Sequence, residues 1–148
     1  QKILNFSRGK KIKREDVEKI TGAPKTLLVN DYISAIATNN LEEGIMIVKQ
    51  ASDENLDMKL FLKLIIQKFR MAIILRYAPK LEKEMMGDLS VEDLTFLKSF
   101  KEKDPINGTY MFNSTALLIL LGAYQNIDSA FISELPLELA LVKIIKKE

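Results

Sequence analysis

The sequence contains neither cysteine nor histidine. Without cysteine, the chain has no disulfide, no thiolate nucleophile and no cysteine-ligated metal. Without histidine, it lacks the usual general base, the Ser-His-Asp arrangement and most transition-metal sites. Catalysis would have to depend on paired carboxylates or on a buried lysine. We therefore expect this chain to have no catalytic residue, cofactor or metal ligand and not to be an enzyme by itself.

Acidic clusters are present, but their positions indicate structural roles. The pairs Glu42-Glu43 and Glu92-Asp93 each lie where a helix is expected to begin, and the helix dipole stabilises negative charge there. The acidic residues at 53–57 lack the glycine and the distal glutamate of a calcium-binding loop, which indicates a polar turn. Residues 22–26 lack the glycine spacing of a phosphate-binding loop.

Long hydrophobic runs are also missing. The longest, at 116–124, is about half of the roughly 20 residues that a membrane span needs, so we interpret it as core. The absence of cysteine is compatible with a reducing compartment, and we expect a cytoplasmic protein. Its 148 residues, 47% hydrophobic and 28% charged, are typical of one globular domain with the edge of a second.

Positive charge is concentrated in the first 25 residues, although the net charge is only +2. A short helix at 13–20 is expected to end at Gly22 and Pro24, and this is our predicted domain boundary, with units at 1–22 and 23–148. The candidates for contacts with DNA phosphates are Lys10, Lys11, Lys13 and Arg14. No aromatic residues are interleaved with them, so a solvated linker is the favoured interpretation.

Helical periodicity covers the rest of the chain and predicts an all-α bundle of about five to six helices. The expected helices lie at 26–38, 40–51, 57–78, 90–100, 110–131 and 136–147. Asn40 with Glu43, and Ser90 with Asp93, have the spacing of reciprocal capping pairs. The helix at 57–78 is apolar around most of its circumference, which is typical of the central member of a bundle.

The order of these segments resembles a known family. The stretches that carry the resemblance are 20–23 (Ile-Thr-Gly-Ala), 61–62 leading into 69–70, 77–79 (Tyr-Ala-Pro) and 135–143 (Leu-Pro-Leu-Glu-Leu-Ala-Leu-Val-Lys). Together they resemble the C-terminal collar domain of the gamma/tau subunit of bacterial DNA polymerase III, the AAA+ motor component of the sliding-clamp loader. The related delta-prime and replication factor C subunits share this layout and remain alternatives.

The resemblance implies a specific function. Residues 1–22 would be the end of an AAA+ lid module, and the remainder the collar through which clamp-loader subunits assemble into a ring for DNA replication. ATP and magnesium would belong to an ATPase module upstream of Gln1. The partners would be other clamp-loader subunits, with DNA contacted only through the assembled complex and no membrane involved, and the fragment itself is a candidate for self-association.

We expect the interfaces on the exposed sides of the helices at 57–78, 110–131 and 136–147, with Arg70, Tyr77 and Tyr124 as candidate contact residues. The rival interpretation is a helical DNA-binding domain that uses the basic segment from Arg8 to Arg14. A small enzyme that relies on carboxylates would need a concave acidic pocket, which the sequence does not indicate.

Overall fold

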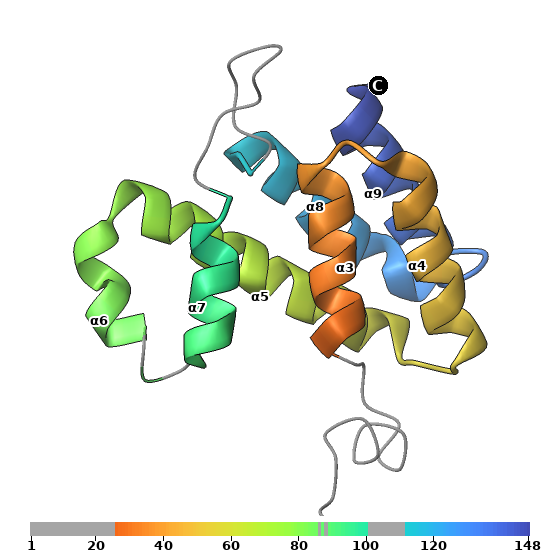
Figure 1. Cartoon of the computed structure of the whole chain (residues 1–148). Helices are drawn as coiled ribbons and strands as arrows, with labels where there is room; N and C mark the ends of the chain where they lie inside the picture. The colour runs from red at the N-terminus through yellow and green to blue at the C-terminus, as the bar shows by residue number, and fades with distance from the viewer. Residues whose placement is uncertain (1–25, 86, 88, 101–111) are drawn as a thin grey trace, which may run out of the picture.

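The computed structural model describes residues 26–85, 87, 89–100 and 112–148, and all regular structure in this part is helical (Figure 1). The all-α class expected from the sequence is therefore confirmed. The elements are, in chain order, α3 (Thr26–Ala37), α4 (Leu41–Asp53), α5 (Met58–Tyr77), the 3-10 helix η1 (Pro79–Leu81), α6 (Glu82–Met85), α7 (Val91–Lys98), α8 (Ser114–Asn126), the 3-10 helix η2 (Ile127–Ser129) and α9 (Leu135–Lys146). The expected helix at 13–20, the domain boundary and the basic segment lie outside the described residues.

Short polar side chains begin four of these helices. Asn40, Asp57, Ser90 and Asn113 each accept a hydrogen bond from a backbone N–H of the first turn. These N–H groups have no partner within the helix, so the cap satisfies a donor that would otherwise face solvent. The starts of α4, α5 and α7 agree with the sequence-based expectation.

The reciprocal half of the expected capping pairs is not formed. The backbone N–H of Asn40 donates to the carbonyl oxygen of Ala35 at 2.9 Å, so it does not need the Glu43 carboxylate. The Asp93 carboxylate instead accepts a hydrogen bond from Lys68 on α5, at 3.3 Å. At Asn40 a hydrogen bond within the preceding turn therefore takes the place of the expected capping bond, and at Asp93 a contact with another helix does so.

The helix expected at 110–131 is shorter at both ends. Its first residues lie outside the described part or precede the Asn113 cap, and α8 ends at Asn126. Beyond Asn126 the chain tightens into η2, where the Ser129 hydroxyl donates to the Asn126 carbonyl oxygen at 3.2 Å. Short polar side chains compete with the helical backbone in this way, which explains why the prediction of a continuous helix to Phe131 was wrong.

Helix α5 is the central element, as expected. Its 20 residues span about 30 Å and pass through the molecule. Its first half packs with α3 and α8, and its second half carries η1, α6 and α7 (Figure 1). The expected polar stripe at Lys59, Lys63, Gln67 and Arg70 is exposed. None of the described helices combines the length and the apolar character needed to cross a membrane.

Aromatic side chains connect the two ends of the core. Tyr32 on α3 meets Phe61 on α5 edge to face, with ring centroids 6.1 Å apart. At the other end, Phe112 contacts Phe69 on α5 and Phe100 after α7, with centroid distances of 4.5 and 4.7 Å. Edge-to-face pairs add about 0.5–1.5 kcal/mol each beyond the burial of their surface. These rings thus help to hold the α7 region on α5, where Leu94 and Leu97 of α7 are also buried.

Candidate functional site

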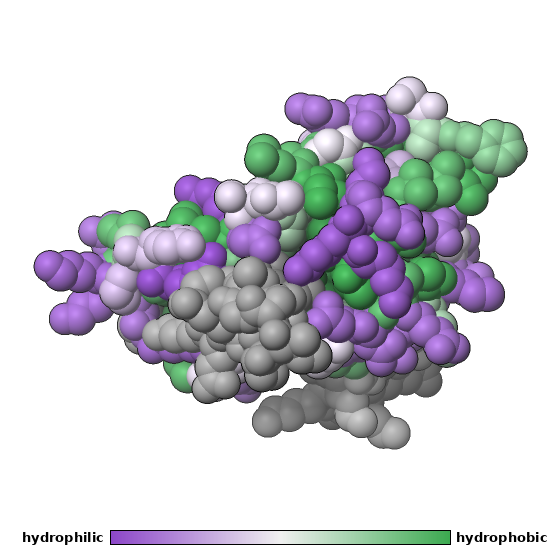
Figure 2. Space-filling view, turned by 90° about the horizontal axis from the view of Figure 1, so that it is seen from above, coloured by the Kyte–Doolittle hydropathy of each residue, from purple (hydrophilic) through white to green (hydrophobic). Residues whose placement is uncertain are grey.

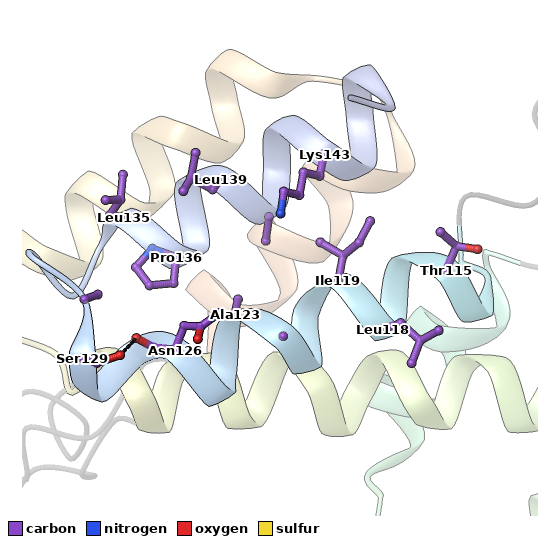
Figure 3. Close-up of a pocket in the computed structure, with 13 residues that line it drawn as sticks. Thr115, Leu118, Ile119, Ala123, Asn126, Ser129, Leu135, Pro136, Leu139 and Lys143 are labelled. Atoms are coloured by element: carbon purple, nitrogen blue, oxygen red, sulfur yellow. Dashed lines mark hydrogen bonds between the residues drawn. The ribbon is translucent and has the colours of Figure 1, made fainter.

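A groove runs between α8 and α9 on the outside of the bundle, with a volume of about 550 Å³ (Figure 3). Its walls are the outward sides of the two helices: Thr115, Leu118 and Ile119 from α8, and Leu135, Leu139 and Lys143 from α9. Figure 3 shows Ile119 and Lys143 extending from the two helices toward each other. Most of this lining is apolar, and Lys143 supplies the one charge among its residues.

The floor of the groove is made of small side chains. Gly122, Ala123 and Ala140 lie where the two helices face each other, together with Pro136 in the first turn of α9. A Cβ atom added at Gly122 would meet no other atom within 4 Å. The small residues leave open space between the two helices, and amphipathic helices bind in apolar grooves of this kind in other proteins.

Apolar side chains at the rim stay in contact with solvent. Leu118 is 67% exposed and Leu139 is 49% exposed. Other large apolar side chains of the described residues, such as Phe61 and Leu141, are fully buried in the core. Seen from above the molecule, hydrophobic surface reaches the outside between hydrophilic side chains (Figure 2). Clustered exposure of this kind marks interaction surfaces more often than isolated exposed leucines do.

The loop between η2 and α9 displays the most exposed of these side chains. Phe131 is 92% exposed, and Ile132 beside it is also exposed. Both ends of the loop are tied to the bundle: Asp128 pairs with Lys59 of α5 at 2.6 Å, and Glu134 accepts a hydrogen bond from Ser52 of α4. The loop is therefore fixed at both ends, and Phe131 follows Ala130, which lines the groove, without lining the groove itself.

A second hollow, of about 470 Å³, lies between α4 and α9. It is lined by Leu41, Glu42, Ile45 and Met46 of α4 and by Lys146 of α9. Met46 is 58% exposed, and both Glu42 and Glu43 are exposed beside it. We call Glu42, Glu43 and Met46 the α4 ridge. Helix α9 thus has a hollow on each side.

The carboxylates near the α4 ridge are crowded. Burial raises the pKa of Asp31 above its usual value of 3.8, and the negative charge of Glu43 raises it further. Within the described part of the chain, no lysine or arginine nitrogen lies within 4.0 Å of the Glu42 or Glu43 carboxylate. Glu42 and Glu43 therefore form no ion pair among the described residues, although Lys146 lines the same hollow as Glu42.

The three predicted interface residues do not form one site. Arg70 and Tyr77 are exposed on the same side of α5, about two turns apart. The Tyr77 ring lies beneath the Arg76 guanidinium, with 4.7 Å between the guanidinium carbon and the ring centroid. Tyr124 is half-buried on α8 near the opposite end of α5, where the Lys59 amine lies 5.5 Å from its ring centroid. The two tyrosines are therefore separated along α5 by about 27 Å, at 1.5 Å per residue.

The predicted phosphate contacts, Lys10, Lys11, Lys13 and Arg14, lie outside the described residues. Two functional candidates were missed by the sequence analysis. Phe131 was assigned to the end of a helix. The two apolar helices α8 and α9 were predicted, but the groove between them was not. The run of adjacent small residues at Gly122-Ala123, together with Ala140, is the signal in the sequence that marks the groove.

Among the described residues, no three acidic side chains are close enough together to hold a metal ion. The groove lining contains no carboxylate, and its chemistry is that of an apolar surface with one amine. This arrangement is suited to protein recognition. Comparison with protein-family models gives no match, and no curated protein matches this sequence, so the function is inferred from the sequence pattern and the geometry.

Proposed function

We propose that this chain is an assembly domain that joins protein subunits, and specifically the collar of a gamma/tau-type subunit of a bacterial DNA polymerase III clamp loader. It contributes contacts between subunits and no chemistry of its own. The observation that carries the proposal is the exposure of the apolar side chains Leu118 and Leu139 in the α8/α9 groove, together with the exposed Phe131 in the adjoining loop. The sequence resemblance at residues 135–143 supports it, because this stretch forms one wall of the groove.

The free energy gained by burying Phe131 can be compared with the free-energy cost of association. A phenylalanine side chain buries roughly 150–250 Å². At about 25 cal/mol per Å², burial of Phe131 contributes about 4–6 kcal/mol before other terms. Association costs an estimated 4–15 kcal/mol in lost freedom of motion. Phe131 alone therefore does not hold a complex, and the groove must contribute further apolar contacts.

In this proposal, the assembled ring couples neighbouring ATPase modules mechanically. The ATP and magnesium that drive the machine are bound by the module upstream of this chain. DNA is reached only through the complete complex. The collar supplies a fixed frame, and a bundle whose large side chains are well buried, as at Phe61, Phe69 and Leu120, suits that role.

The test is association with defined subunits. The chain is mixed with purified delta, delta-prime and gamma/tau subunits of a bacterial clamp loader, and the masses of the complexes are measured by light scattering during gel filtration. We expect a complex with at least one of these subunits. The variant Phe131→Ser should bind at least tenfold more weakly, because a fully buried aromatic side chain typically contributes 2 kcal/mol or more. Its thermal unfolding should be unchanged, since Phe131 is already exposed.

Two outcomes would overturn the proposal. A chain that binds none of these subunits, at concentrations up to about 1 mM where weak interfaces still form, is not a collar. Submicromolar binding to duplex DNA with a steep dependence on salt would favour the DNA-binding alternative through the basic segment from Arg8 to Arg14. Binding confined to partners of the delta-prime or replication factor C type would identify the alternative subunit.

A further inference from the structure

The α4 ridge and the α8/α9 groove lie on different sides of α9. Leu141 of α9 faces α4, because a Cβ atom added at Gly44 would lie 2.9 Å from its Cδ1 atom. Pro136, Ala140 and Lys143 instead line the groove toward α8. Helix α9 therefore separates the ridge from the groove. The two surfaces cannot meet within one molecule, but they can meet between two molecules.

The two surfaces are complementary in charge. The groove contains the Lys143 amine and no carboxylate among its lining residues. The ridge contains the carboxylates of Glu42 and Glu43, which have no cationic partner within 4.0 Å in the described part of the chain. An amine and a carboxylate from opposite sides of an interface steer association and fix its register.

The apolar side chain of the ridge also suits the apolar groove. The ridge is one side of an amphipathic helix whose exposed apolar side chain, Met46, projects between the two glutamates and Lys49. The groove has apolar walls, and its small-residue floor leaves open space above Gly122. A flexible methionine side chain adapts to an irregular apolar cavity at little cost. A helix lying in an apolar groove is a recurring mode of protein recognition.

We infer that the α4 ridge of one copy of this chain docks into the α8/α9 groove of a second copy, with Glu42 or Glu43 facing Lys143. The inference rests on the proposed assembly function and specifies its surfaces and their polarity. Because each copy uses two different surfaces, the contact is head-to-tail. Such contacts generate a ring where the rotation closes and an open filament where it does not, and they do not stop at a symmetric dimer.

The test uses one variant that blocks each surface in the full chain. Met46→Glu places a charge at the centre of the ridge, and Gly122→Phe fills the groove without a clash at Cβ. Val91→Glu on α7 is the control, because Val91 is at least as exposed as Met46 and lies on neither surface. Circular dichroism on heating establishes that all three variants fold. The association states are measured by sedimentation equilibrium.

We expect the parent chain and Val91→Glu to form the same concentration-dependent oligomers. Met46→Glu alone and Gly122→Phe alone should each associate at least tenfold more weakly. Their equimolar mixture should form a dimer and nothing larger, because the first variant retains a groove and the second retains a ridge. A symmetric groove-to-groove contact gives a different result, since Met46→Glu would then associate like the parent, and this would overturn the inference.

Charge reversal gives a second test that does not depend on Gly122. Lys143→Glu should weaken association, and adding a chain that carries both Glu42→Lys and Glu43→Lys should restore it in the mixture. No restoration would overturn the inference.

These outcomes separate this inference from the proposed function. If the parent chain is monomeric but binds clamp-loader subunits, a second copy is not the occupant, and the proposed function stands. If the parent associates and none of these variants weakens it, the assembly function again stands with different surfaces. If the parent binds neither itself nor those subunits, both proposals fail.

Discussion

The hydroxyl of Tyr32 donates a hydrogen bond to the backbone oxygen of Leu137, at 3.0 Å and across 105 positions of the sequence. It joins α3, the first described helix, to α9, the last. The Tyr32 side chain is fully buried, and burial raises the pKa of its hydroxyl, so the proton is retained and donated. This bond fixes the position of α9, and therefore of one wall of the groove, relative to the rest of the bundle.

We predict that Tyr32→Phe destabilises the fold by about 1 kcal/mol, the net contribution of a typical buried hydrogen bond. The ring and its contact with Phe61 are retained in this variant. Urea unfolding should show a lower midpoint with an unchanged slope. The matched control is Tyr77→Phe, because the Tyr77 side chain is exposed and, among the described residues, its hydroxyl accepts a hydrogen bond only from the neighbouring Arg76. Equal effects in the two variants would contradict the prediction.

Two helical glycines should respond oppositely to alanine. A Cβ atom at Gly44 of α4 would lie 2.9 and 3.0 Å from the Cδ atoms of the fully buried Leu141, whereas one at Gly122 of α8 would meet nothing within 4 Å. Both substitutions gain about 0.5–1 kcal/mol from the lower conformational entropy of alanine. At Gly44, overpacking of the core opposes this gain by about 1–3 kcal/mol.

Gly122→Ala should therefore raise the free energy of unfolding, and Gly44→Ala should give a value lower by about 1–3 kcal/mol than that of Gly122→Ala. Both are measured by urea unfolding under the same conditions. If the two variants are equally stable, Leu141 has moved without cost and the α4–α9 contact is looser than described. A crystal structure or amide exchange in α9 then locates the change.

Lys68 ties three helices together. Its amine donates to the side-chain oxygen of Asn30 on α3 at 2.6 Å and to the Asp93 carboxylate on α7 at 3.3 Å. The Lys68 and Asp93 side chains are only 14% and 21% exposed, so solvent screens their interaction weakly. Removal of the amine leaves a half-buried carboxylate without this partner, which is more costly than the loss of a surface pair.

We predict a coupling energy of about 1–2 kcal/mol between Lys68 and Asp93, intermediate between surface and fully buried pairs. It is measured with a double-mutant cycle that uses Lys68→Met, which keeps most of the apolar stem, and Asp93→Asn. The same cycle on Lys49 and Asp53, a largely exposed pair on α4, serves as a comparison and should give a smaller value. Comparable couplings in the two cycles would show that burial does not strengthen the Lys68 pair.

Asp31 gives the fold a specific dependence on pH. Its pKa in the folded chain lies above 3.8, chiefly through burial and secondarily through the charge of Glu43. The folded state therefore holds this proton more tightly than the unfolded state does, and the Asp31 contribution to stability falls as pH rises from 3.8 through the folded pKa. At neutral pH the charged form is a net penalty.

The variant Asp31→Asn should accordingly be more stable than the parent at pH 7, and this difference should disappear below pH 3.8, where Asp31 is protonated in both states. Side-chain NMR titration gives the Asp31 pKa directly. Glu43→Gln should lower it only in part, because burial is the larger cause. An Asp31 pKa at or below 3.8 in the folded chain would refute the assignment.

Local signals in the sequence were sufficient for the helices themselves. The capping residues Asn40, Asp57 and Ser90 and the break at Pro79 gave the limits of α4, α5 and α7, because these interactions involve neighbours within a few residues. The helices η1 and α6 were missed because Pro79, interpreted only as a stop, also begins the next short helix. The predicted extension of α8 to Phe131 was wrong for a similar reason. Hydrophobic periodicity does not show where polar side chains form hydrogen bonds with the backbone and end a helix.

The sequence by itself determined the all-helical class, the central position of α5 and the absence of cysteine and histidine chemistry, because periodicity and residue type are local properties. Only the tertiary structure decided which apolar residues remain exposed. Leu118 and Leu120 are both leucines in one apolar helix, yet Leu120 is buried and Leu118 lines the groove. Their difference depends on where α5 and α9 pack against α8, and the position of α9 depends on contacts such as the hydrogen bond from Tyr32 to Leu137, which joins residues far apart in the chain.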